Sequence, residues 1–158
     1  MNTTSQSKSR VWQNGARVAF LAVIVLSLGA CSVMTMVHGG AKKPAASEFG
    51  LGPRTSANGL YTATLESPEP LRTRKLQTLQ VTIQDASASS VDGASIAIDG
   101  GMPQHGHGLP TKPRVTKNLG GGVYVIEGVR FNMGGWWEFK VAIQGAAGPD
   151  TVTFNIAL

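Results

Sequence analysis

The residues best suited to chemistry lie in one short glycine-rich stretch, Met-Pro-Gln-His-Gly-His-Gly-Leu-Pro, at positions 102–110. It holds two of the chain's three histidines, His105 and His107, together with the thioether of Met102. Imidazole nitrogen binds copper, zinc, iron and nickel, whereas thioether sulfur selects Cu(I). This donor set therefore favours copper over zinc as the metal that the stretch could bind.

Two residues outside the stretch could complete such a site. Met133 lies in a loop before a strand-like run, and in an antiparallel sandwich that loop could lie at the same end as the histidines. Asp99 is the available hard ligand, or a hydrogen-bond partner for a metal-bound imidazole, because such rings usually donate their second N–H to a carboxylate or carbonyl. The candidate metal ligands are thus Met102, His105, His107 and Met133. Asp99 is a further ligand or the hydrogen-bond partner of a ligating histidine.

A structural interpretation of the same stretch stays open. A His-Gly-His segment between two prolines could be an ordered crossover whose histidines hydrogen-bond backbone carbonyls and cover one end of the core. Met102 would then fill a gap in that core. Binding of a small ligand or of a protein partner is a third alternative.

Catalysis has little support in the sequence. We find no Ser-His-acid spacing, no paired carboxylates and no cysteine nucleophile, and the glycines at 120–122 lie between strands, where phosphate binding would require the start of a helix. Those glycines predict a hairpin turn instead. We therefore expect a protein that is not an enzyme.

The amino-terminal region indicates export. Residues 1–30 contain Lys8, Arg10 and Arg17 without an acid, then an apolar run over 18–28. This order is typical of a secretory signal peptide, and the run is shorter than the roughly 20 residues of a membrane-spanning helix. The signal ends in Leu-Gly-Ala-Cys, which resembles the lipobox of bacterial lipoproteins. The resemblance implies that lipid on Cys31 holds the protein on a membrane of the bacterial cell envelope, facing the periplasm or the exterior.

Charge and cysteine content argue against a nucleic-acid partner and against a disulfide. The chain has 14 Lys and Arg and 9 Asp and Glu, but three of the basic residues lie in the signal, which leaves 11 against 9. No basic stripe with interleaved aromatic residues remains, so we expect no nucleic-acid partner. Cys31 is the one cysteine, which excludes an intramolecular disulfide.

The rest of the chain divides into a tether and one domain. Residues 31–58 are rich in Gly, Ala, Ser, Lys and Pro, a composition that buries too little apolar surface to order itself, and they predict a flexible tether. From 59 to 158, apolar and polar residues alternate with the period of a half-buried strand. Strands are predicted over 60–66, 79–84, 94–99, 114–117, 122–129, 137–143 and 152–158, with Gly100 and Gly101 ending the third. About seven short strands predict an all-β, immunoglobulin-like antiparallel β-sandwich.

The alternation also predicts the core. The residues expected between the two sheets are Leu79, Val81, Ile83, Ile96, Ile98, Trp137, Phe139, Val141, Phe154 and Ile156. Trp136 should point the opposite way and stay partly exposed, where it could be an interaction surface for another envelope protein or merely cover an edge.

Three segments together carry a resemblance to a known family. The stretch at 102–111, the run Gly-Val-Tyr-Val-Ile-Glu-Gly-Val at 122–129, and Phe-Asn-Met-Gly-Gly-Trp-Trp at 131–137 are similar to YtkA-like/FixH-like domains. The resemblance implies a small β-sandwich, often tethered to a membrane, with some members linked to copper handling or cytochrome oxidase assembly. His105 and His107 match the family's Met-Pro-x-His-Gly-His motif, and Met133 matches a Met or similar residue before the Gly-x-Trp strand. We thus expect either an envelope lipoprotein that binds or passes on copper, or a non-metal module that docks on another envelope protein.

Overall fold

A computed structural model describes residues 41–158 of the chain. The predicted signal peptide, the lipidation site at Cys31 and the first part of the tether lie outside the described residues. No helix within 41–158 is both long and apolar enough to cross a bilayer.

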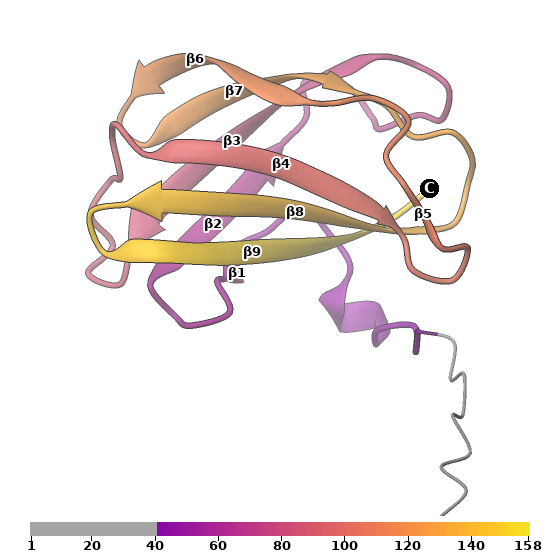
Figure 1. Cartoon of the computed structure of the whole chain (residues 1–158), viewed down its shortest axis with the longest axis horizontal. Coiled ribbons are helices and arrows are strands. Elements are labelled where there is room, and N and C mark those ends of the chain that lie inside the picture. Colours follow the sequence, from indigo (N-terminus) through magenta and orange to yellow (C-terminus); the bar gives the residue numbers. More distant parts are fainter. Residues whose placement is uncertain (1–40) are drawn as a thin grey trace, which may run out of the picture. The chain divides into compact units, whose positions relative to one another are not determined.

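The described part of the chain is built from nine strands and one short 3-10 turn (Figure 1). All seven predicted strands are confirmed. Alternating apolar residues bury one face of the strands predicted at 60–66, 79–84, 137–143 and 152–158, whereas the strand predicted at 114–117 is exposed except for the half-buried Val115. The two others, β1 and β5, have two residues each, too short to show alternation. The elements are η1 (Ala46–Glu48), β1 (Arg54–Thr55), β2 (Tyr61–Glu66), β3 (Gln77–Asp85), β4 (Ser95–Met102), β5 (His107–Gly108), β6 (Arg114–Gly120), β7 (Val123–Val129), β8 (Trp136–Gly145) and β9 (Gly148–Ala157).

The strands form one antiparallel path in the order β1-β2-β3-β7-β6-β4-β8-β9, with β5 paired to β4. At two places the strands are joined by a single residue pair or bridge. One residue pair, Ala97 with Arg114, joins β4 to β6, and an isolated parallel bridge between Phe49 and Asn155 brings the chain before β1 against β9. The sheet thus curls into a nearly closed barrel. The predicted all-β antiparallel class is confirmed. The expected immunoglobulin-like sandwich of two sheets and about seven strands is instead one continuous sheet, with eight strands along the path and β5 beside it.

The core lies between the curled halves of the sheet. Eight of the ten predicted core residues are buried, and Trp137, Phe139 and Phe154 are fully so. Ile96 and Ile98 point inward but are only half-buried. They lie on β4 beside the thin junction with β6, where one residue pair leaves the strand partly uncovered.

The predicted tether is shorter than expected. Residues 46–58 belong to the folded domain, since β1 pairs with β2 and the backbone N–H of Gly50 donates to the carbonyl of Asn155 at 2.9 Å. Leu51 also packs against the core. A few apolar side chains and backbone hydrogen bonds to two existing strands order this glycine-rich segment, which its composition alone did not predict.

The prediction that Gly100 and Gly101 end the third strand is wrong. β4 continues through both glycines to Met102 and pairs with β8 as far as Gly101 with Glu138. A Cβ at Gly100 would lie 2.4 Å from the carbonyl oxygen of Glu138, and one at Gly101 would lie 2.5 Å from that of His107. Glycine therefore lets three backbones approach here, where it was expected to break the strand.

Candidate metal-binding hairpin

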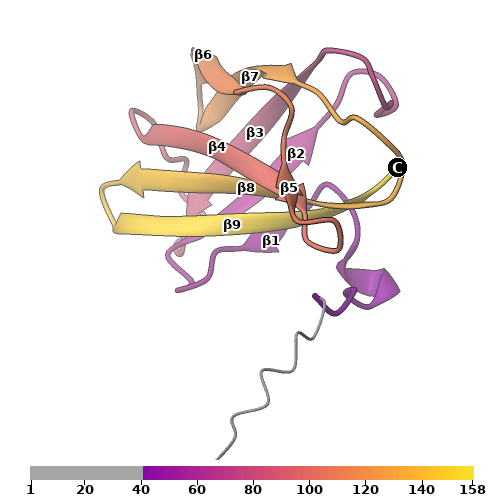
Figure 2. The ribbon, with the colours of Figure 1, turned by 45° about the vertical axis from the view of Figure 1, so that its right-hand side comes forward.

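The histidine stretch is a tight β-hairpin instead of an open loop. β5 folds back on β4, so that His107 pairs with Met102 and Gly108 with Gly101. The carbonyl of Met102 accepts the backbone N–H groups of His105 and Gly106, each at 3.0 Å. We call residues 102–108 the histidine hairpin; Figure 2 shows it at the end of β4.

The hairpin brings its two imidazoles together on the surface. The rings of His105 and His107 are stacked, with centroids 5.9 Å apart and 27° between their planes. Both side chains are exposed. A hairpin turn, and not extended backbone, produces this arrangement.

His107 also touches the core. Its ring meets the ring of Trp137 edge to face, with centroids 5.9 Å apart and 64° between the planes. Its Nδ1 lies 3.5 Å from the carbonyl oxygen of Gly108, at the outer limit of a hydrogen bond. His107 thus covers a buried tryptophan, as the structural interpretation expects, while His105 lies beyond it. The sequence alternation placed Trp137 in the core but did not indicate its contact with a histidine.

Met102 lies in the core and not at the surface. Its side chain is 2% exposed and belongs to the buried cluster. A Cβ at Gly135 would be only 2.7 Å from its Cε, so the methyl group packs against that glycine's backbone. This position fits the interpretation of Met102 as a core residue, although Met102 also lines the surface hollow that His107 lines.

Met133 lies at the same end of the barrel, as the topology predicted. Its loop joins β7 to β8, and the contact between Gly135 and Met102 places that loop against the histidine hairpin. The carbonyl of Met133 accepts the Nε1–H of Trp137 at 3.1 Å. Its side chain is 43% exposed. Trp137 therefore contacts both His107 and the backbone of Met133, whose thioether is open to solvent.

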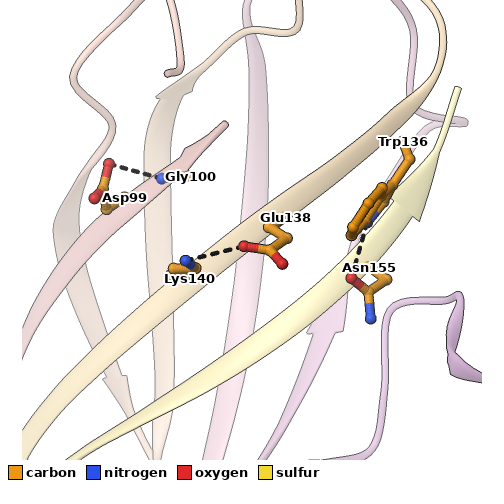
Figure 3. A network of polar contacts seen from close by, with 6 residues as sticks. All are labelled: Asp99, Gly100, Trp136, Glu138, Lys140 and Asn155. Atoms are coloured by element: carbon orange, nitrogen blue, oxygen red, sulfur yellow. Dashed lines mark hydrogen bonds and ion pairs between the residues drawn. The ribbon is translucent and has the colours of Figure 1, made fainter. Parts of the chain in front are cut away.

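Asp99 lies on the outer face of β4, and its Oδ1 accepts the backbone N–H of Gly100 at 2.8 Å (Figure 3). It shares a shallow hollow of about 370 Å³ with His107, Glu138 and Lys140. Among the hydrogen bonds within 41–158, none joins Asp99 to either histidine. Lys140 pairs with Glu138 at 2.9 Å. The role of Asp99 behind a metal site stays a prediction.

Trp136 does not have the predicted exposure. The side chain is 4% exposed, and its Nε1–H donates to Oδ1 of Asn155 at 2.9 Å (Figure 3). The alternation correctly turned it away from Trp137. However, the outer face is covered there, because Asn155 also contacts the segment before β1 through Phe49 and the carbonyl of Glu48. The exposed ring that motivated a docking surface at Trp136 is absent.

Asp150 is a buried carboxylate that the sequence did not single out. Burial would raise its pKa, but hydrogen bonds from the Ser56 hydroxyl and from the backbone of Thr151, Leu60 and Asn58 outweigh it and hold the pKa below its ordinary value of 3.8. Asp150 thus ties the segment before β2 to β9. An aspartate after Gly-Pro is typical of a turn, so the sequence did not indicate that Asp150 accepts these hydrogen bonds.

The donor chemistry bears on which metal would fit. Within residues 41–158 no three His, Cys, Asp or Glu side chains come together in a way that could hold a metal ion. Structural zinc sites use four such ligands and catalytic ones three. Two imidazoles with a nearby thioether are a poor match for zinc and suit Cu(I) better.

A comparison with protein families decides the relationship of the chain. The family described as YtkA-like matches residues 55–142, which is more than half of the sequence and runs from β1 into β8. The chain belongs to the YtkA-like family. The matched part of this YtkA-like domain contains the whole histidine hairpin, Met133 and Trp137. No curated protein matches the chain, and no solved structure does.

Proposed function

We propose that this YtkA-like protein is a lipid-anchored component of the bacterial cell envelope that binds Cu(I) and passes it on. The ligands are His105 and His107, with Met133 as the thioether donor. The role is binding, not catalysis, and the anchor is the lipid on Cys31.

One observation carries the proposal. The stacked, exposed imidazoles of His105 and His107 lie at the same end of the barrel as the exposed thioether of Met133. Trp137 contacts His107 through its ring and Met133 through a hydrogen bond, which keeps the two parts of the site close. A rigid core residue that contacts one donor side chain and the backbone of the loop carrying another is the support that a binding site needs.

The exposure of the donors supports transfer rather than storage. Both histidines are open to solvent and Met133 is 43% exposed, so a partner's ligands could approach the metal directly. We assign Met102 the second of the two roles that the sequence left open, since it packs beneath the hairpin as a core residue. Met102 therefore supports the hairpin from the core, and Met133 supplies the thioether ligand of the proposed site.

A Cu(I) titration against a competing chelator tests the proposal, using residues 32–158 so that lipid does not interfere. We expect binding tighter than micromolar. It should be lost in the double variant that combines His105→Ala with His107→Ala, and weakened in Met133→Leu. Gln104→Ala is the matched control, because it changes an exposed residue of the same turn without removing a soft donor. Wild-type affinity in the double histidine variant, or no binding tighter than micromolar, would refute the copper function.

A further inference from the structure

The loop between β2 and β3 carries an exposed apolar side chain among cations. Leu76 is 67% exposed, more than the other exposed large apolar residues of the described chain, Leu119 and Met133. Arg72, Arg74 and Lys75 precede it and are exposed as well. We call residues 72–76 the basic loop.

The fold holds the basic loop in one conformation. The side-chain amide of Gln77 brackets Arg72, accepting its backbone N–H at 2.8 Å and donating to its carbonyl at 2.9 Å. The N–H of Arg74 donates to the carbonyl of Phe131 at 2.6 Å, and Arg74 has the left-handed φ of 64°. A non-glycine residue keeps such a φ where its surroundings determine it. The exposure of Leu76 is therefore built into the fold.

The cations of the basic loop have little internal neutralisation. The one ion pair among residues 41–158 joins Lys140 to Glu138, on another part of the surface. A hollow of about 310 Å³ beside the loop is lined by Arg72 and Lys75, with Glu69 as its one acid. The loop thus presents a net positive, partly concave surface beside an exposed leucine.

The basic loop lies at the end of the barrel where the chain arrives from its tether (Figures 1 and 2). Its partner Phe131 is in the β7–β8 loop, whose Gly135 exchanges two backbone hydrogen bonds with Leu158. Leu158 follows β9, and Asn155 near the end of that strand contacts Phe49. Cys31 and Ala41 are ten Cα–Cα steps apart, which span at most about 36 Å, so the proposed lipid on Cys31 would hold the start of the domain within about that distance of a membrane.

We propose that the basic loop docks on an anionic lipid surface, with Leu76 inserted among the headgroups and Arg72, Arg74 and Lys75 against the phosphates. Anionic membranes attract such cations, and long basic side chains place their heads at the interface while their stems contact apolar groups. A protein partner would require an apolar core within roughly 800 Å² of contact per side. One leucine ringed by cations suits lipid better. The placement near a membrane depends on the proposed anchor, whereas the lipid binding itself does not.

Vesicle co-sedimentation of residues 32–158 tests this without a lipid anchor, since these residues contain the buried cluster of the barrel, which runs from Tyr61 to Ile156. Vesicles of phosphatidylcholine mixed with phosphatidylglycerol should bind the protein, and vesicles of phosphatidylcholine alone should not. The binding should weaken in high salt, which screens exposed charges. Each cation near an anionic surface contributes about fivefold to partitioning. The double variant that combines Arg72→Gln with Lys75→Gln should therefore lose more than tenfold in vesicle affinity, and Leu76→Ser should lose severalfold.

The matched control is Lys117→Gln, Leu119→Ser, which removes a cation and the other exposed leucine, both on β6. It should bind vesicles as the wild type does. Equal binding to neutral vesicles, no binding to anionic ones, or an equal loss in the control would each overturn the proposal. Cu(I) affinity, measured on the same variants, should stay unchanged, so a failure of lipid docking is distinguishable from a failure of the copper function.

Discussion

The imidazole of His107 lies edge-on against the indole of Trp137, with 5.9 Å between the ring centroids. Trp137 is fully buried, and its Nε1–H donates to the carbonyl of Met133. One core residue therefore positions parts of two loops. The position of the candidate site is set by the packing of the barrel as well as by the hairpin itself.

This contact predicts that the two histidines differ in their effect on stability. His107→Ala removes an aromatic pair with Trp137 and should lower the free energy of unfolding by about 1 kcal/mol. His105→Ala should change it by less than about 0.5 kcal/mol, because the ring is exposed and touches His107 alone among aromatic neighbours. Urea unfolding followed by tryptophan fluorescence measures both. Equal losses would mean that the contact with Trp137 contributes nothing.

Met102 provides a test of whether its sulfur is a ligand or a core atom. Met102→Leu conserves volume and should cost less than about 1.5 kcal/mol, while Met102→Ala leaves a cavity and should cost about 2 to 5 kcal/mol. Cu(I) affinity should be unchanged in the leucine variant. A tenfold loss of affinity in a folded Met102→Leu protein would instead make Met102 a ligand. Met133→Leu is the counterpart, and we expect it to weaken Cu(I) binding with little effect on stability.

The close packing of backbone at Gly100 predicts a large effect for a small change. An alanine Cβ would lie 2.4 Å from the carbonyl oxygen of Glu138, a backbone atom of the paired strand. Gly100→Ala should force β4 away from β8 and destabilise the protein by about 1 to 3 kcal/mol. Thermal unfolding monitored by circular dichroism checks this against Gly108→Ala, whose Cβ would meet nothing closer than 3.4 Å. Similar melting temperatures for the two variants would contradict the crowding.

The lowered pKa of Asp150 predicts acid sensitivity. Because the carboxylate binds protons less readily in the folded state than in the unfolded chain, its contribution to stability is fully present above its ordinary pKa of 3.8 and is lost as pH falls through the lower folded value. Asp150→Asn should therefore melt earlier than the wild type at neutral pH, and the difference should shrink below about pH 4. Melting curves across that range test the sign. A difference that is constant with pH would show that the ionised form has no special role.

Most of the fold could be predicted from alternation. In the strand that carries Trp137, Phe139 and Val141, the local alternation alone indicates which face is buried. Segments without that pattern could not be predicted in the same way. The chain around Phe49 is ordered by backbone contacts to Asn155, which lies far away in the sequence, and Gly100 looks like a strand breaker until the neighbouring backbone is known.

The candidate site was predictable in its residues more than in its roles. The types and spacing of His105 and His107 identified the stretch but not its hairpin conformation, and topology placed Met133 near it. The sequence could not distinguish a surface methionine from a buried one, so it left Met102 open as a metal ligand or a core residue, and the side chain lies in the core. Trp136 was expected at the surface, because alternation gives the face of a side chain but not what covers that face.

The attachment of the segment before β2 would have a mechanical consequence if, as we propose, the protein is held by lipid at its amino terminus. A pull transmitted along the tether would load the contacts of Glu48 and Gly50 with Asn155 first, and then β1 and the Asp150 carboxylate. These few contacts would yield before the ladder between β8 and β9, which pairs along the whole of β8. The amino-terminal segment can thus peel away under tension and lengthen the tether, while Trp137 and the histidine hairpin stay folded.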